Sequence, residues 1–353
     1  GPVRRRAVVT GMRTKAFLLL ATAIWMHVFA ADAADVERIR LQSRDAVLEV
    51  TPALGGRVLA FGLVGQPSLI KIGDPVASQP NPAVSATADD IGYLGHDVWL
   101  GPQSGWWSDQ QVNAARRDAR AVWPPDPYLA FAQTRVVARA PDRLVLEGID
   151  SPVTGVRLLK SFAFDPADPA TLELSALARN IRDRPVSRDL WFNTRTSAAT
   201  RVYVPVATAA DVRIEAAEAM APAWRIDAGV FSFLPPSAAG ASRRGKVLMQ
   251  PSAGWMAGFA HGQAFVIRFD LQPRSAIHPQ QGQVELYLDH GEDIAAGLLE
   301  MEVHAPYRTL APGEAMQARE RWTVLAYDGA DTPQAHLAFL CRRLQLCAVS
   351  TAD

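Results

Sequence analysis

Hydrophobic and polar residues alternate in short runs along most of the chain, from Val36 to about Tyr327. A period of two residues is typical of strands that are buried on one face. Gly, Pro, Asp and Asn separate these runs, and long amphipathic helical windows are scarce. The pattern therefore predicts an all-β sandwich or barrel. The predicted strands lie near residues 46–50, 57–61, 143–147, 171–175, 264–269, 284–288, 298–303 and 321–325.

Two segments depart from this pattern. Residues 74–128 form a long irregular stretch with four Trp and many Pro, and loops of this kind are usually functional or disordered. The Trp content argues against disorder. Residues 332–346 predict a terminal helix, with Thr332 as the N-cap and Pro333 at the first helical position. The sequence thus predicts one large β domain over 34–328 and a short helical tail over 329–353.

The first 33 residues have the order of a cleaved secretory signal. Basic residues precede an apolar run over 16–30, and residues 31–33 (Ala-Asp-Ala) fit a small-x-small cleavage site. Met12 fits a native start, with residues 1–11 upstream of it. The apolar run is too short for an ordinary transmembrane helix, although an uncleaved anchor is the alternative. We expect a periplasmic or secreted protein without stable membrane insertion after cleavage.

Composition and charge narrow the classes of partner. The chain has 353 residues, 36 basic and 36 acidic, and 49% of its residues are hydrophobic. This composition excludes intrinsic disorder. Without the leader, 31 basic and 35 acidic residues remain, a formal charge of −4. A nucleic-acid partner is therefore not expected, because no positive excess exists to release counterions. Neutral glycans are compatible with this charge.

Cys341 and Cys347 are the two cysteines of the chain. Two cysteines cannot form a disulfide scaffold or a Cys-based zinc site. An oxidising compartment would permit a bond between them. The alternative is two unpaired thiols, because positions six apart on a helix point to different faces.

The main candidate for catalysis lies near the end of the domain. If residues 298–304 form a strand, Glu300, Glu302 and His304 point to one face and apolar residues point to the other. Such a face is costly to bury without partners. It could form the polar floor of a cleft, with the carboxylates as acid or base and His304 as proton partner. Glu285, in the preceding segment, is a candidate binding residue. The alternative is a solvent-exposed strand face.

Aromatic residues gather in the irregular stretch and are interleaved with polar side chains. Flat aromatic faces beside hydrogen-bonding groups suit a sugar ring, which has apolar faces and polar edges. The alternative is that these Trp residues pack against the sheet and hold the loop down. The candidate binding residues of this cluster are Trp99, Trp107, Trp123, Gln103, Asp126 and His96.

A third patch follows near residues 190–196. Asn193 and Arg195 alternate with Phe192 and Thr194 and offer donors to hydroxyl or carboxylate groups. The alternative is an ordinary structural strand. His261 is a further binding candidate, although a lone histidine is more often structural than a metal ligand. The chain lacks GxGxxG, P-loop, HExxH and GxSxG motifs. We therefore expect neither a cofactor nor a metal.

Several of these segments together resemble the galactose mutarotase-like superfamily, and within it a mutarotase-related group of the DUF4380 type. The resemblance rests on the Gly-Gly-Arg turn within 51–61, the Trp/Pro segment over 99–126, and the ending over 300–314 followed by Trp322. It implies a β-supersandwich with a sugar-binding cleft on one concave sheet. It also places Glu302 at the position of the base that takes a proton from the anomeric hydroxyl, with Glu300 second.

The acid histidine of the epimerases has no counterpart after residue 170, because their Asn-His motif is absent. His96, His261 and His304 are the substitutes that the sequence offers. The first hypothesis is an exported protein that recognises a small or oligomeric carbohydrate and acts like an aldose 1-epimerase. The alternatives are a non-catalytic glycan-binding module and a glycoside hydrolase or lyase. The sequence leaves the oligomeric state open.

Overall fold

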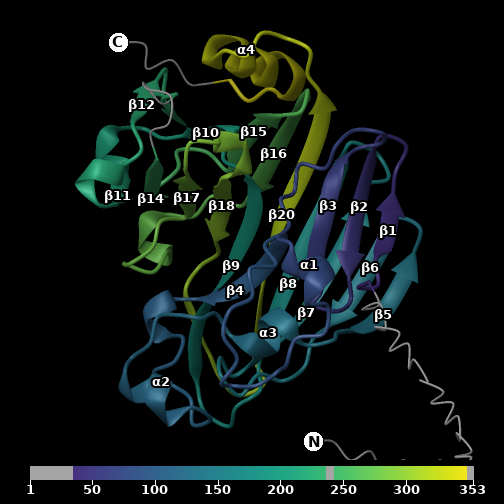
Figure 1. Cartoon of the computed structure of the whole chain (residues 1–353), viewed down its shortest axis with the longest axis vertical. Helices are drawn as coiled ribbons and strands as arrows, with labels where there is room; N and C mark the ends of the chain where they lie inside the picture. Colours follow the sequence, from purple (N-terminus) through teal and green to yellow (C-terminus); the bar gives the residue numbers. More distant parts are fainter. Residues whose placement is uncertain (1–34, 236–241, 348–353) are drawn as a thin grey trace, which may run out of the picture.

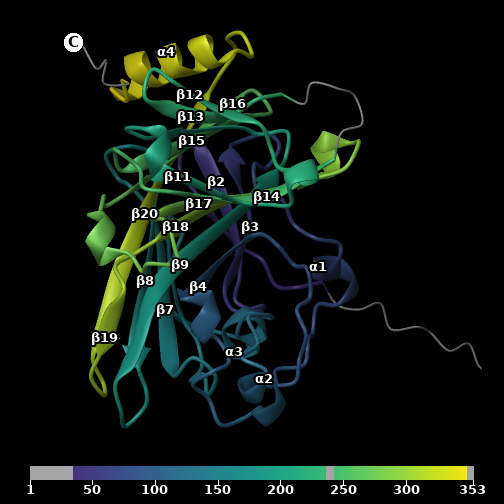
Figure 2. The same cartoon turned by 90° about the vertical axis from the view of Figure 1, so that its left-hand side faces the viewer.

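The computed structural model describes residues 35–235 and 242–347. The leader predicted over 1–33 lies outside the described residues. Two antiparallel sheets of ten strands each pack face to face (Figures 1 and 2). The all-β prediction and the predicted terminal helix are both confirmed. No helix of the described ranges is long and apolar enough to span a bilayer.

The first sheet carries the site described below. In spatial order its strands are β1 (Ile39–Gln42), β2 (Ala46–Thr51), β3 (Arg57–Leu63), β4 (His96–Gly101), β9 (Val186–Ser197), β18 (Leu298–His304), β17 (Val284–His290), β14 (Arg243–Met249) and β11 (Val212–Glu215). The short strand β19 (Arg308–Leu310) also pairs with β9.

The second sheet supports the first from behind. In spatial order its strands are β12 (Trp224–Asp227), β13 (Val230–Phe233), β10 (Arg201–Pro205), β15 (Trp255–Ala260), β16 (Gln263–Phe269), β20 (Ala315–Ala326), β8 (Thr171–Asn180), β7 (Val156–Phe164), β6 (Arg143–Glu147) and β5 (Arg135–Ala140).

The helices are short and lie outside the sheets. They are α1 (Pro75–Ser78), α2 (Ala114–Asp118), α3 (Pro127–Phe131), α4 (Pro333–Leu344) and the 3-10 turns η1 (Gln103–Gly105), η2 (Ala209–Asp211), η3 (Glu218–Met220), η4 (Arg274–Ala276) and η5 (Ile294–Ala296).

The main core lies between the two sheets. Alternation along the strands places one apolar row of each sheet in this space, as in β7, where every second residue from Val156 to Phe164 is buried. In β18 the inward row is Leu299, Met301 and Val303. Each such side chain contributes about 1.5–3 kcal/mol when fully buried. Because this apolar row points into the core, the polar residues that alternate with it in β18 point to the outer face of the sheet.

The prediction of an irregular segment over 74–128 was wrong for residues 96–101. These residues form β4, which lies between β3 and β9, and all six are buried. Polar His96 and Asp97 begin the strand and Pro102 follows it, so the local pattern does not alternate clearly. Other elements, not the strand's own sequence, bury both of its faces. The rest of the segment, with α1, α2 and α3, lies beside β4 in both views (Figures 1 and 2).

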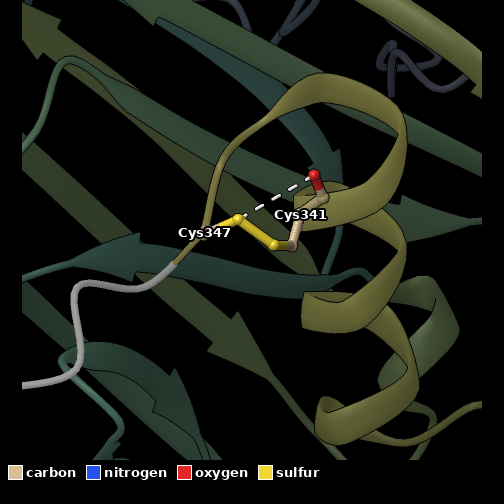
Figure 3. The surroundings of a disulfide bond; sticks show 2 residues. All are labelled: Cys341 and Cys347. Carbon is tan, nitrogen blue, oxygen red and sulfur yellow. Dashed lines mark hydrogen bonds between the residues drawn. A yellow bond between two sulfur atoms is a disulfide. The ribbon is translucent and has the colours of Figure 1, made fainter.

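The terminal helix α4 covers the outer face of the second sheet near β10, β15 and β16 (Figure 1). Phe339 and Leu340 are buried there. The helix ends at Leu344, and Gln345 takes a left-handed conformation with φ of 57°. The chain then folds back, and Cys347 forms a disulfide with Cys341 (Figure 3). The alternative of two unpaired thiols assumed that both cysteines lie on one continuous helix. The helix instead ends before Cys347, at the left-handed Gln345.

Candidate functional site

A cavity of about 720 Å³ lies on the outer face of the first sheet. Strands β4, β9, β18, β17 and β14 turn alternate side chains toward it. The segment near residues 90–94 and the loop around Trp123 form one wall, and residues 215–220 form another. The sheet residues that line the cavity are Asp97, Trp99, Trp191, Arg195, Arg244, Lys246, Tyr287 and Glu300.

The three candidate catalytic residues share the outer face of β18 but lie at different depths. Cross-strand pairing places Glu300 opposite Arg195 and Glu302 opposite Asn193. The side chain of Glu300 is 14% exposed and lines the cavity. Glu302 and His304 are completely buried. Glu300 is therefore the member of the trio that a ligand in this cavity can contact.

An ionic cluster lines the cavity around Arg195. Its Nε donates to Glu300 Oε1 at 2.8 Å, and its Nη1 pairs with Asp97. Arg57 Nη1 lies 3.1 Å from Asp97 Oδ2, which also accepts from Trp99 Nε1 at 3.1 Å. Burial opposes ionisation of Asp97, but the two guanidinium groups outweigh it and hold the pKa of this carboxyl well below its usual range. Asp97 and the two arginines are therefore charged at neutral pH, and their ion pairs hold them in place.

A second ionic cluster lies deeper, with Lys246 at its centre. The ammonium Nζ is 2.6 Å from Glu285 Oε2 and 3.1 Å from Glu302 Oε2. Glu302 Oε2 also accepts from Trp191 Nε1 at 2.6 Å. The Lys246 ammonium lies 4.6 Å from the centre of the Trp191 ring, an arrangement that adds a cation–π contact. Lys246 and Trp191 thus separate Glu302 from the cavity.

His304 extends this cluster away from the cavity. Its Nδ1 lies 2.7 Å from Asp189 Oδ2, and its Nε2 lies 3.3 Å from Glu285 Oε1. Burial alone would lower the pKa of His304, but the two carboxylates outweigh it and raise the pKa to about 9. Between these carboxylates the imidazole is positively charged at neutral pH. It therefore acts as a buried cation rather than as an acid that a ligand can reach.

Gly101, the last residue of β4, allows this arrangement. A Cβ atom at this position would overlap Asp189 Oδ1 and Gln281 Nε2. Because Asp189 is fully buried, its carboxylate has no room to move aside without losing His304. A side chain at residue 101 is thus incompatible with the Asp189–His304 pair.

The ligand atoms of Glu285, Glu302 and His304 lie within 4.8 Å of one another, a spacing that a metal ion could use. The charge of the group argues against that use. A metal needs a neutral imidazole as ligand, whereas His304 is protonated, and the Lys246 ammonium already lies between the two carboxylates. The donor set therefore fits an internal salt-bridge network better than a metal centre.

Four of the predicted binding residues lie away from the cavity. His96 points into the core between the sheets, where its Nδ1 pairs with Thr194 Oγ1 at 2.9 Å and its ring packs edge-on to Trp322. His261 lies in the hairpin turn between β15 and β16 of the second sheet. Neither histidine lines this cavity. Alternation in β4 puts His96 on the face opposite Asp97.

Trp107 and Asp126 hold the loop wall and do not contact the cavity. Trp107 is fully buried, and its Nε1 donates to the Pro124 carbonyl at 2.7 Å. Asp126 caps α3 by accepting from the Tyr128 amide at 2.9 Å, and it also accepts from Thr154 Oγ1. At these two positions, the structure shows the packing and hydrogen bonds that the structural alternative expects.

The remaining predicted residues do gather at one place. Trp99, Gln103, Trp123, Arg195 and Glu300 line the cavity. Asn193, Glu285, Glu302 and His304 lie in the layer of polar residues beneath them. Sequence reasoning missed Lys246, Asp189 and Arg57. Lys246 follows Gly245 and precedes an apolar run over 247–249, and this local sequence does not reveal the carboxylates that it meets.

Comparisons with known proteins agree with this architecture. The family model described as a domain of unknown function, DUF4380, matches residues 36–325. A comparison with curated protein sequences gave no significant match.

Several solved structures are similar in fold at low sequence identity. The Slr1438 protein from Synechocystis sp. PCC 6803 has a TM-score of 0.53 at 14% identity, and the match covers 85% of this chain and 100% of that protein. A galactose mutarotase-like protein from Lactobacillus casei has a TM-score of 0.52 at 9% identity, with 82% and 100% covered. The GalM/aldose epimerase homologue from C. elegans has a TM-score of 0.50 at 10% identity, with 83% and 100% covered. The chain belongs to the DUF4380 family, and its fold is galactose mutarotase-like.

Proposed function

We propose that this protein is exported and binds a carbohydrate in the cavity on the outer face of the first sheet. The observation that carries the proposal is the pairing of aromatic rings with fixed polar groups in one cavity. Trp123 is 50% exposed, and its ring lies 6.2 Å from that of Trp99. Arg195 and Glu300 line the same cavity. Aromatic faces suit the apolar C–H faces of a sugar, and charged donors and acceptors suit its hydroxyl groups.

The balance of charge around the cavity supports a neutral ligand. Four cations and four anions line it, namely Arg57, Arg195, Arg244, Lys246, Asp90, Asp97, Glu215 and Glu300. Most of them pair with one another or with the polar layer beneath. A strongly anionic ligand would have to disrupt these pairs, whereas hydroxyl groups can hydrogen-bond to them as they stand. The name of the Lactobacillus casei structure, galactose mutarotase-like, is in keeping with a carbohydrate ligand.

Replacing Trp123 with Ala is expected to weaken carbohydrate binding at least tenfold and to leave stability nearly unchanged. Half of the ring is exposed, so its loss removes contact area for a ligand and little core packing. A glycan array would first identify a ligand, and titration calorimetry would then compare the affinities. Tyr307→Ala is the matched control, because Tyr307 is also a partly exposed aromatic and lies outside the cavity lining. Equal affinities in the wild type and in Trp123→Ala would contradict the proposal.

Acid–base chemistry at the anomeric centre is the second candidate function, and the exposure of Glu300 favours it. The resemblance placed the base at Glu302, but Lys246 and Trp191 cover that carboxylate. Glu300 is the predicted second candidate, and it lines the cavity. If the protein is an epimerase-like enzyme, we propose that Glu300 takes the proton from the anomeric hydroxyl.

Glu300→Gln is the variant that separates an enzyme from a binding module. In an enzyme, it is expected to lower the mutarotation rate of a bound sugar about 100-fold, because a neutral amide cannot accept the proton. Affinity would fall only a few-fold. Polarimetry on freshly dissolved sugar measures the rate, and Glu292→Gln, at an exposed position, is the control. A wild-type rate no faster than that of free sugar would favour the binding module, and chain cleavage seen by mass spectrometry would favour a hydrolase or lyase.

A further inference from the structure

Asp90 is the one charged residue of the cavity that has no partner in the described part of the chain. The other seven charged residues that line the cavity each form an ion pair, either within the lining or with a neighbouring side chain. The Asp90 side chain is exposed and lines the cavity. Within residues 35–235 and 242–347, neither an ion pair nor a hydrogen bond engages its carboxyl oxygens. Both oxygens are therefore available to a ligand.

The segment that presents Asp90 is held on both sides. Before it, Arg116 Nη1 donates to the Ala88 carbonyl at 3.0 Å. After it, Arg57 Nη1 donates to the Leu94 carbonyl at 2.7 Å. These contacts fix the backbone that carries the carboxyl group, and such preorganisation reduces the entropic cost of binding.

Positive charge lies near Asp90, but other carboxylates already neutralise it. Arg57 and Arg195 both pair with Asp97, and Arg195 pairs with Glu300 as well. Burial raises the pKa of Asp90, and the two guanidinium groups offset only part of that effect. The protein therefore leaves this carboxyl group poorly solvated, and hydrogen-bond donors brought by a ligand would stabilise its charge.

The chemistry of a carboxylate defines what those donors can be. An ionised carboxylate only accepts hydrogen bonds, and its two oxygens can accept from two donors that lie side by side. Two adjacent hydroxyl groups of a sugar ring offer such a pair. An ether, an ester or a phosphate at the same place would bring further acceptors and leave the carboxylate unpaired, which counts against binding.

We propose that Asp90 is a specificity-determining residue of the cavity, whose carboxylate accepts hydrogen bonds from two adjacent, unsubstituted hydroxyl groups of the bound sugar. Sugars that lack one of these hydroxyl groups, or that carry a substituent on it, bind more weakly because a polar group of the site loses its partner. This inference rests on the proposed carbohydrate-binding function and names the part of the ligand that is selected.

The test combines variants of Asp90 with sugars that lack single hydroxyl groups. Titration calorimetry would use glucose, galactose and mannose, and then the monodeoxy and amino derivatives of the sugar that binds most tightly. In the wild type, loss of either hydroxyl group of one adjacent pair is expected to weaken binding about tenfold, because a charged acceptor loses a donor. Asp90→Ala is expected to bind the parent sugar about tenfold more weakly, and removal of the same two hydroxyl groups should then cost little further affinity. Asp90→Asn, which keeps one acceptor oxygen, should lie between the two.

Asp89→Ala is the matched control. Asp89 is the adjacent residue, its side chain is 91% exposed, and it lies outside the cavity lining. Its ion pair with Arg116 lies at the surface and contributes little to stability. This variant should bind the parent and the deoxy sugars as the wild type does. Urea denaturation checks the fold of each variant, and Asp90→Ala should keep the wild-type midpoint because Asp90 has no partner to lose.

The outcomes separate this inference from the function on which it rests. If Asp90→Ala binds the parent sugar as tightly as the wild type, or if the deoxy sugars lose as much affinity in Asp90→Ala as in the wild type, the inference is wrong. It is also wrong if an amino sugar gains affinity through Asp90 over its hydroxyl parent, because the donor would then be an ammonium group. In each case, weaker binding by Trp123→Ala would still support a sugar site. If no sugar of the panel binds, both the inference and the proposed function are wrong.

Discussion

Replacing Lys246 with Met is expected to destabilise the protein by about 3–5 kcal/mol at neutral pH, the usual cost of breaking a buried ion pair. The Lys246 ammonium lies against Glu285 and Glu302, and both carboxylates are buried. Burial already raises the pKa of Glu302 to about 7 with Lys246 present, so without the ammonium this group would be protonated, and the buried Glu285 carboxylate would lose its closest cation. Urea denaturation followed by circular dichroism measures this loss. The same variant would disturb the cavity, so stability and binding have to be measured separately.

The effect of this substitution should depend on pH in a defined direction. Burial would raise the pKa of Glu285, but Lys246 and His304 outweigh it, and in the wild type the pKa is lowered. A lowered pKa stabilises the folded state above the unfolded value and loses that contribution as the pH falls through the folded pKa. Removing Lys246 abolishes much of this contribution. The difference between wild type and Lys246→Met should therefore be large at pH 7 and should shrink as the pH falls from about 4.5 to about 2.

Two further variants make this prediction specific. Lys71→Met removes a lysine that is only partly buried and donates to one carbonyl, so it should cost less than about 1 kcal/mol. Adding Glu302→Gln to Lys246→Met removes the buried carboxyl group nearest to Glu285 without leaving a group that can ionise there, and it should restore part of the stability. If Lys246→Met cost no more than Lys71→Met, the buried network would not contribute to stability as described.

The strands around the candidate site were predictable because each contains its own signal. In residues 298–304, apolar and polar side chains alternate, and the structure turns the apolar row into the core. The terminal helix was equally clear, since Thr332 caps it with a bond to the Ala335 amide. Local periodicity and capping depend on neighbouring residues, which the sequence shows directly.

Other features depend on contacts between distant parts of the chain. Strand β4 was missed because its burial comes from β3, β9 and the Trp-rich loop, not from its own alternation. Alternation also gives the face of a side chain but not its depth. Glu300 and Glu302 share one face of β18, yet Glu300 is accessible and Glu302 is covered by Lys246. Lys246 lies 56 residues before Glu302 in the sequence, so alternation within β18 could not predict this difference. The accessible carboxylate therefore had to come from the tertiary structure.

Glu320 of β20 also has a buried carboxyl group, which lies in the core between the sheets, away from the cavity. Its Oε2 accepts from Trp322 Nε1 at 2.8 Å, and its Oε1 has no partner among the described residues. Within the part of the chain that the structure describes, no cation pairs with it, in contrast to Glu285. Burial therefore raises the pKa of Glu320 to about 8, so this side chain is mostly neutral in the folded protein at neutral pH.

Glu320→Gln is expected to stabilise the protein by about 2 kcal/mol at pH 8. In the wild type the folded pKa of about 8 exceeds the unfolded value near 4.5, so the folded state holds a proton that the unfolded state releases. Stability accordingly falls as the pH rises between these values, by up to about 1.4 kcal/mol per pH unit. Glutamine still accepts from Trp322 and cannot ionise, although its unpaired amide hydrogens offset part of the gain. The advantage of the variant should therefore appear above pH 5 and grow toward pH 8.

Urea denaturation of wild type and variant across pH 4–9 measures this difference, with Glu292→Gln, at an exposed position, as the control. Parallel stability curves for wild type and Glu320→Gln would show that Glu320 is ionised in the folded state, and the core would then have to contain a charge without a counterion.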